Sequence, residues 1–64
     1  MNPISEQVHA ARLARNMTQA DLALRAGVCR QTVQRIEAGK HIGPFDMLER
    51  VCRELGLTIR LEKR

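Results

Sequence analysis

The sequence is poor in residues that build covalent or metal-based frameworks. It has two cysteines, Cys29 and Cys52, and two histidines among 64 residues. None of them forms a CxxC or HxxxH pair, so we expect no structural metal and no cofactor. The first 20 residues lack the apolar run of a secretory signal. We therefore expect a cytoplasmic chain whose two cysteines are free thiols rather than a disulfide.

Long apolar runs and catalytic groupings are missing as well. No stretch approaches the roughly 20 apolar residues that cross a membrane. The sequence offers no Ser-His-Asp set and no paired carboxylates, and 64 residues leave little room for a concave pocket. We therefore expect neither a membrane protein nor an enzyme. A domain of this size is only marginally stable as a monomer, so we expect an oligomer to supply additional stability.

What the sequence does contain is a localised positive charge. Eleven Lys and Arg against seven Asp and Glu give a net charge of +4. Residues 25–41 hold four basic residues and one acid, whereas residues 44–55 hold three acids and two basic residues. A basic balance in a small domain indicates a polyanionic partner, with plain solubility as the alternative. Because the positive charge is concentrated in one part of the sequence, we favour a polyanionic partner.

Apolar residues at helical spacing predict four short helices and one strand. We expect helices over residues 4–15, 18–27, 30–38 and 44–56. Thr18 and Asp21 resemble a capping box at the start of the second helix, and Gly27 is its expected end. The last segment, "LTIRLEKR", alternates apolar and polar residues with a period of two, which predicts a strand over residues 57–64.

The second and third predicted helices meet at a glycine, which is the layout of a helix-turn-helix unit. In the DNA-binding form, the second helix of the unit enters the major groove and its early residues meet base edges. Arg bonds both acceptors of guanine, and Gln bonds both groups of adenine. An ordinary solvated surface, the alternative, would be richer in Glu and Lys. The outer faces of this predicted helix instead carry Arg30, Gln31, Thr32, Gln34 and Arg35.

From Val8 to Leu55 the chain resembles the Cro/CI-type helix-turn-helix family of bacterial and phage regulators, also called the XRE family. The resemblance rests on "MTQADLA", "RAGVCRQTV" and "RIEAGK" followed by "GPFDML...LG". It implies a compact, mainly α, lambda-repressor-like domain over residues 4–56. It also implies phosphate contacts by Gln19 and Lys40, a base or phosphate contact by Thr32, and base contacts by Arg30, Gln31 and Arg35.

The resemblance further implies an internal ion pair between Arg12 and Glu37. The sequence supports the pair, because both residues lie beside predicted inward-facing positions, where an unpaired charge is costly. Solvation of both groups is the alternative. Cys29 stands where the family commonly has Ser or Thr, which puts a cap or phosphate contact there in doubt; a redox-sensitive thiol is another interpretation. His9 lies off the apolar stripe and is expected to face solvent.

The predicted C-terminal strand indicates which kind of helix-turn-helix regulator the chain resembles. No other segment reads as a strand, so the pairing edge is expected to come from an identical subunit. This layout resembles that of antitoxins paired with HipA-type kinase toxins, in which a C-terminal strand joins two subunits. The apolar residues of the predicted dimerisation strand are Leu57, Ile59 and Leu61.

Together these observations predict a dimeric, nucleoid-associated bacterial repressor that binds a palindromic operator in double-stranded DNA. The resemblance favours an antitoxin that regulates its own operon and has a kinase-like toxin as a partner. A free-standing phage or plasmid repressor is the nearest alternative. A protein-interaction module of the same fold is a further one, although such a module is expected to lose the outward Arg and Gln residues.

Overall fold

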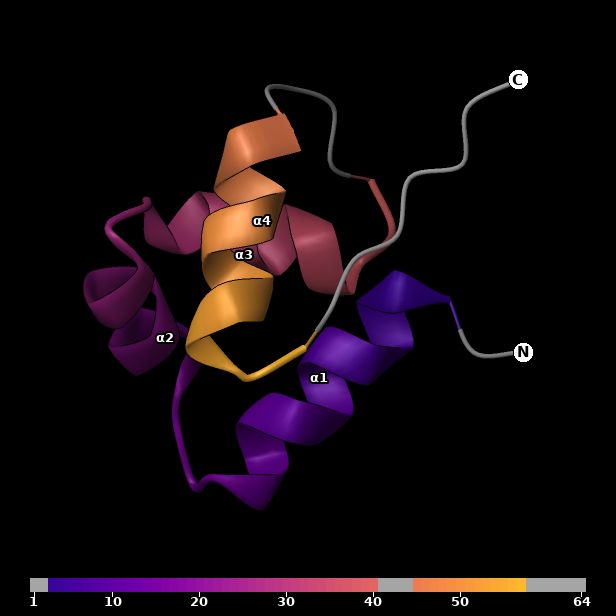
Figure 1. Cartoon of the computed structure of the whole chain (residues 1–64), viewed down its shortest axis with the longest axis vertical. Coiled ribbons are helices and arrows are strands. Elements are labelled where there is room, and N and C mark those ends of the chain that lie inside the picture. The colour runs from indigo at the N-terminus through magenta and orange to yellow at the C-terminus, as the bar shows by residue number, and fades with distance from the viewer. Residues whose placement is uncertain (1–2, 41–44, 58–64) are drawn as a thin grey trace.

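The computed structural model describes residues 3–40 and 45–57, and four helices account for most of this part of the chain. They are α1 (Ile4–Ala14), α2 (Gln19–Ala26), α3 (Arg30–Glu37) and α4 (Phe45–Glu54). Figure 1 shows α4 crossing in front of α3, with α1 and α2 on either side. The prediction of a compact, mainly helical, four-helix domain is confirmed for the described residues.

One apolar core lies between the helices. α2 packs against α3 and α4, and α3 also packs against α1 and α4. Each helix contributes side chains at the spacing that the sequence predicted, because residues three and four apart share one helix face. The buried core consists of Val8, Leu22, Ala23, Ala26, Val33, Ile36, Val51, Cys52 and Leu55.

The start and end of α2 follow directly from its sequence. Asp21 N–H donates to Thr18 Oγ1 at 3.0 Å, and Thr18 N–H donates to Asp21 Oδ2 at 3.1 Å. This reciprocal pair is the predicted capping box. At the other end, Gly27 adopts a φ of +73°, a left-handed conformation that costs other residues more than glycine. The tight turn into α3 therefore depends on a residue without a side chain.

The first residue of α4 lies at the margin of the core. Phe45, one of the apolar residues of the predicted fourth helix, is 38% exposed. Pro44, where that helix is predicted to begin, lies outside the described residues. The buried side chains of this helix, Val51 and Cys52, come from its second half, and the helix packs against α2 and α3.

Leu57 closes the helical domain instead of opening a strand. Its N–H donates to the Cys52 carbonyl at 2.8 Å, while the N–H of Gly56, which has a φ of +72°, donates to the Arg53 carbonyl at 3.1 Å. These two bonds form the usual glycine-containing end of a helix. The Leu57 side chain is half-buried against the core. Residues 3–40 and 45–57 contain no strand, and the rest of the predicted strand, with Ile59 and Leu61, lies outside them.

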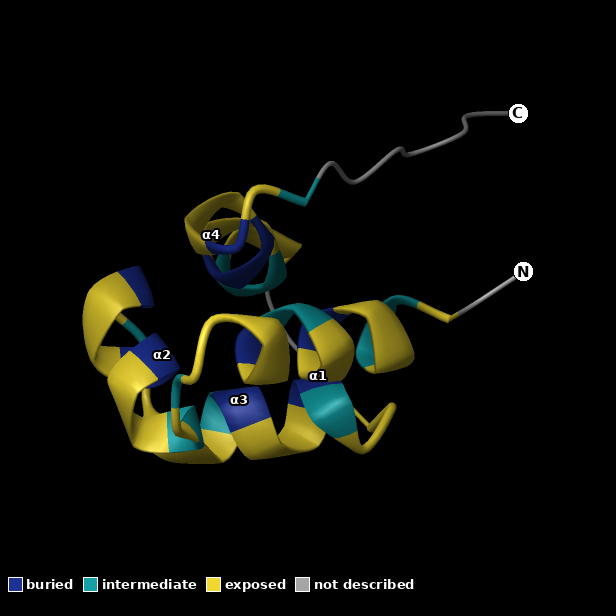
Figure 2. Cartoon of the chain, turned by 90° about the horizontal axis from the view of Figure 1, so that it is seen from below, coloured by how far each residue is buried: buried dark blue, intermediate teal, exposed yellow. Residues whose placement is uncertain are grey.

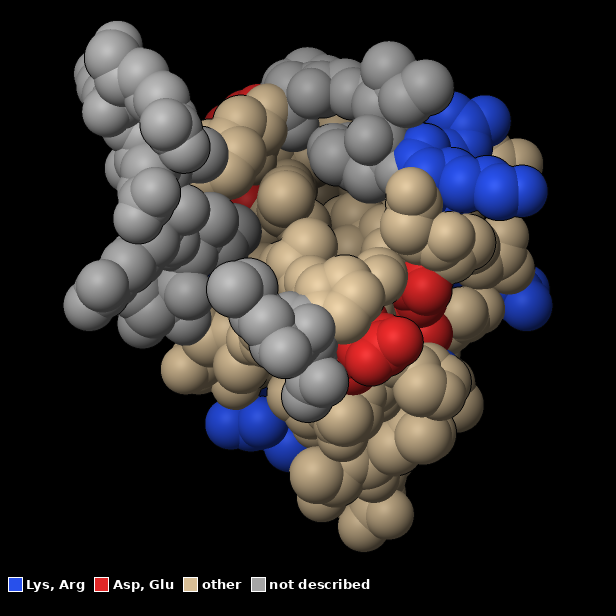
Figure 3. All heavy atoms as spheres, turned by 90° about the vertical axis from the view of Figure 1, so that its right-hand side faces the viewer, with Lys and Arg blue, Asp and Glu red and all other residues tan. Residues whose placement is uncertain are grey.

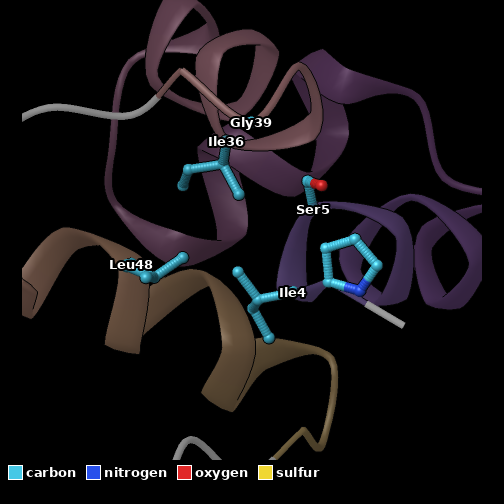
Figure 4. A pocket seen from close by; sticks show the side chains of 6 residues that line it. Ile4, Ser5, Ile36, Gly39 and Leu48 are labelled. Carbon is cyan, nitrogen blue, oxygen red and sulfur yellow. The ribbon is translucent and has the colours of Figure 1, made fainter. Parts of the chain in front are cut away.

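A small hollow lies where α1, α3 and α4 meet. It measures about 260 Å³, and Figure 4 shows Ile4, Ile36 and Leu48 pointing toward one another within it. Ser5 supplies a hydroxyl at its edge. The hollow is therefore a gap between apolar side chains, and its described lining contains no titratable group. None of the helices in the described part is long and apolar enough to cross a membrane.

Candidate nucleic-acid interface

α3 divides its residues between the core and a polar outer face. Val33 and Ile36 are buried, whereas the residues between and before them are largely exposed. Figure 2 shows the buried side of α3 turned toward α1 and α4, and its exposed side along the lower edge of the molecule. The exposed side carries the three predicted base-contacting residues, Arg30, Gln31 and Arg35, together with Gln34; Thr32 is half-buried.

The polar side chains of this outer face have no partner among the described residues of the chain. No side chain of Arg30, Gln31, Thr32, Gln34 or Arg35 forms a hydrogen bond or ion pair with any residue in 3–40 or 45–57. Their donors and acceptors therefore point to solvent or to a ligand. Residues 31, 34 and 35 are three and four positions apart, so their side chains share one strip of the helix surface.

Lys40 is held immediately beyond the end of α3. Its backbone N–H donates to the Arg35 carbonyl at 2.8 Å, and Gly39 before it has a φ of +73°. The side chain of Lys40 is exposed. The chain reversal therefore presents an ammonium group beside the C-terminal end of the outer face of α3.

Gln19 and Arg30 line one open groove. This groove, about 640 Å³ in volume, runs between the end of α1, the start of α2 and the start of α3. Gln19 is the first residue of α2, where backbone N–H groups and the helix dipole favour an anion. The structure thus brings a predicted phosphate-contacting residue and a predicted base-contacting residue to the same groove.

Arg12 and Glu37 form a two-point contact between α1 and α3. Arg12 Nε donates to Glu37 Oε2 at 2.6 Å, and Arg12 Nη2 donates to Glu37 Oε1 at 3.1 Å. Arg12 Nη1 donates to the Met17 carbonyl at 2.7 Å, in the segment that leads into α2. The exposed fractions of the two side chains are 10% and 6%. The pair therefore ties α1 to α3 and to the segment before α2, and it is nearly shielded from water.

Two further side chains complete what we term the Glu37 junction, formed by His9, Arg12, Gln19 and Glu37. His9 Nδ1 lies 2.8 Å from Glu37 Oε1, and Gln19 Nε2 donates to the same oxygen at 3.3 Å. No buried side-chain nitrogen or oxygen in the described part of the chain lacks a hydrogen-bond partner. The carboxylate of Glu37 is thus bonded from both α1 and α2.

The junction shifts the ionisation of both partners toward their charged forms. Burial by itself raises the pKa of Glu37, but hydrogen bonds from Arg12, His9 and Gln19 and the charge of Arg12 outweigh it, so the pKa is lowered. The hydrogen bond to Glu37 raises the pKa of Arg12 against the opposing effect of burial. The pair is therefore a carboxylate and a guanidinium at neutral pH.

Sequence reasoning missed the role of His9. Its side chain is 52% exposed, in line with its position off the apolar stripe, yet one ring nitrogen contacts the nearly buried Glu37. The spacing could have predicted this contact, because His9 and Arg12 are three residues apart on a helix and are therefore neighbours on its surface. A residue predicted to pair with Arg12 was thus also within reach of His9.

Cys29 precedes α3 without capping it. It occupies the N-cap position, but its side chain makes no cap hydrogen bond, and the thiol is exposed. A thiol is a weak donor and acceptor, so this outcome agrees with the expectation from its residue type. Cys52 is buried in the core, and burial raises the pKa of its thiol.

The charges are unevenly distributed over the molecule. On the face shown in Figure 3, acidic side chains lie near the centre, and Lys and Arg side chains lie toward the edges of the described surface. Within the described part, no three His, Cys, Asp or Glu residues are grouped so as to hold a metal ion.

Known proteins are similar to this chain in sequence and structure. Residues 8–61 match the family model described as "Helix-turn-helix". The chain is also similar to the solved structure of a point mutant of the Restriction-Modification Controller Protein C.Esp1396I, with a TM-score of 0.73 and 27% sequence identity. The match covers 86% of this chain and 70% of the controller chain.

Proposed function

This chain belongs to the helix-turn-helix family of DNA-binding regulators, and on that premise we propose that it is a sequence-specific transcriptional repressor. The observation that supports the proposal is the outer face of α3. It carries guanidinium and amide groups that are exposed and unbonded within the described part of the domain. Those are the groups that pair with guanine and adenine edges in the major groove.

The residues divide into two roles in this proposal. Arg30, Gln31 and Arg35 contact base edges and so specify the sequence, Gln34 lies on the same DNA-binding face, and Thr32 contacts a base or a phosphate. Gln19 and Lys40 contact the DNA backbone on either side of α3 and so fix its register. The open groove shared by Gln19 and Arg30 supports this division, because it joins the start of α2 to the start of α3.

We propose residues 4–56 as the DNA-binding domain and the remainder of the predicted strand after Leu57, residues 58–64 with Ile59 and Leu61, as the dimerisation strand. A two-fold dimer matches an operator with two inverted half-sites about 34–36 Å apart. Ile59→Pro removes a backbone donor and an apolar side chain together. Sedimentation at micromolar concentration should show a dimer for the wild type and a monomer for the variant; an unchanged dimer would exclude this strand.

Selection of fragments from a random pool of double-stranded DNA tests the function directly. We expect one palindromic sequence to be enriched. Recovery of fragments without any common sequence would contradict a sequence-specific role and favour a protein-interaction module of the same fold. We propose neither an enzymatic activity nor a cofactor, and we place the protein in the cytoplasm with the nucleoid.

Two regulatory settings are candidates. The similarity to a restriction-modification controller favours control of restriction-modification genes. The layout of the C-terminal segment favours an antitoxin whose partner is a kinase-like toxin. The neighbouring genes distinguish the two, because a methyltransferase or endonuclease gene is expected in the first setting and a kinase-like gene in the second. Neither kind of neighbour would favour a free-standing repressor.

A further inference from the structure

His9 combines an exposed ring with a buried anchor. It lies on α1, and its Nδ1 is 2.8 Å from Oε1 of Glu37, which is the last residue of α3. The same oxygen accepts a hydrogen bond from Nε2 of Gln19, at the start of α2. The imidazole therefore lies beside the side chain that we propose as a phosphate contact.

The contact with Glu37 determines which ring nitrogen carries hydrogen. A carboxylate only accepts hydrogen bonds, so Nδ1 of His9 must be the protonated nitrogen and must donate to Glu37. Arg12 Nη2 lies 3.3 Å from this Nδ1, but a guanidinium only donates, so this contact is not a second hydrogen bond. The orientation of the ring is thus set by Glu37, and Nε2 is the remaining nitrogen.

Protonation determines whether Nε2 of His9 can donate a hydrogen bond to a phosphate oxygen. In the neutral ring Nε2 has a lone pair, which a phosphate oxygen cannot bond. In the imidazolium it is an N–H donor on a positively charged ring. Imidazole ordinarily makes this change between pH 5 and pH 8. In the described part, the charged groups that contact His9 are Glu37 from α3 and Arg12 from its own helix. The side chain that α2 supplies to the same Glu37 oxygen, Gln19, is neutral.

We propose that His9 is an additional DNA-backbone contact, made in its protonated form to the phosphate region that Gln19 faces, so that DNA affinity rises as the pH falls. This inference rests on the proposed DNA-binding function. Binding to phosphate stabilises the imidazolium, and by linkage protonation strengthens binding. The Glu37 junction then serves two purposes, since it joins the helices and also holds the ring beside the DNA.

The test is the affinity for the selected operator at pH 6 and pH 8, measured by fluorescence anisotropy with a labelled duplex. An exposed charge pair is modest, so we expect roughly twofold to fivefold tighter binding per half-site at pH 6. The dependence of log affinity on log salt should also steepen, by up to about 0.9 per subunit, because one more phosphate is neutralised. His9→Gln should lose both effects.

The second histidine supplies a matched control. His41→Gln removes the same titratable group elsewhere in the sequence and should retain the gain at pH 6. His9→Arg is charged at both pH values and should bind with equal affinity at both. Thermal melts of each variant at both pH values separate lost folding from lost contact. If His9→Gln does not fold, the comparison of His9→Arg with His41→Gln still decides.

Three results would overturn the inference. They are an affinity of the wild type that does not change between pH 6 and pH 8, a gain that persists in His9→Gln, and a gain that disappears in His41→Gln. Each of them leaves the proposed function intact, because the operator is still bound. A wild-type chain that binds no DNA at either pH would contradict the proposed function and this inference together.

Discussion

The Glu37 junction and the outer face of α3 use similar chemical groups for opposite purposes. At the junction, the guanidinium of Arg12 bonds to the carboxylate of Glu37 inside the domain. On the outer face, the guanidinium of Arg30 and the amide of Gln31 have no partner in the described part of the chain. Residue type alone does not separate a structural polar group from a binding one. The difference lies in whether the fold supplies a partner.

The largest expected effect comes from breaking the junction. Arg12→Met leaves the nearly buried carboxylate of Glu37 without its cation, and Glu37→Met leaves the Arg12 guanidinium without its anion. Removing one partner of a buried pair costs about 3–5 kcal/mol of unfolding free energy. Thermal or urea unfolding of the two single variants measures this loss.

The double variant Arg12→Met/Glu37→Met is the matched control for that experiment. It leaves no unpaired charge, so its loss should be smaller than the sum of the two single losses. Additive losses below a kilocalorie would place both groups effectively in solvent and would remove the distinction between the two regions.

Changes on the outer face should leave stability intact and alter binding. Losing a bidentate base contact costs about 1–3 kcal/mol of binding and relaxes the preference at one base pair. Arg30→Ala and Gln31→Ala should therefore weaken binding to the operator more than binding to random DNA. Lys40→Ala is the comparison variant, and it should weaken both alike and lower the salt slope by about 1.

Anisotropy titrations on operator and random duplexes distinguish these outcomes. If Arg30→Ala and Gln31→Ala lost equal affinity for both duplexes, their side chains would be backbone contacts and the division of roles would be wrong.

A smaller effect is expected at the start of α2, which positions Gln19. Thr18→Ala removes the hydroxyl that accepts from Asp21 N–H and should cost about 1 kcal/mol of unfolding free energy. Thr18→Ser retains the acceptor and should stay close to the wild type. Urea unfolding of both variants checks the cap; equal losses would mean that the methyl group, not the hydrogen bond, matters.

The smallest expected effect is on the stability of the fold at acidic pH. Hydrogen bonds from the Thr18 backbone and hydroxyl lower the pKa of Asp21 in the folded chain. A lowered pKa stabilises the fold above the usual range of an aspartate, and this contribution is lost as the pH falls through the folded value. Asp21→Asn should therefore flatten part of the fall in melting temperature below pH 4. Melting curves from pH 7 to pH 3 measure it, and an unchanged slope would contradict the assignment.

The sequence predicts the helices well because their limits depend on local chemistry. The capping box at Thr18 and the left-handed Gly27 need only neighbouring residues to form. The ion pair between Arg12 and Glu37 could also be predicted from the sequence, because both residues lie beside apolar positions and the family resemblance implies the pair.

Other features depend on distant packing and were therefore missed. The bonds from His9 and Gln19 to Glu37 require the relative placement of three helices, which no local pattern encodes. Leu57 alternates with polar residues as a strand residue would, yet the turn after α4 directs it onto the core. A period of two across a few residues does not distinguish the end of a helix from the start of a strand.

Parallel selection with the wild type and Gln31→Ala tests whether the outer face of α3 reads DNA sequence. Both proteins are given the same random pool of double-stranded DNA, and the enriched fragments are sequenced. We expect a palindrome for the wild type, and for Gln31→Ala the same palindrome with the preference relaxed at one symmetry-related base-pair position. An identical motif from both proteins, or no enriched motif from the wild type, would contradict this expectation.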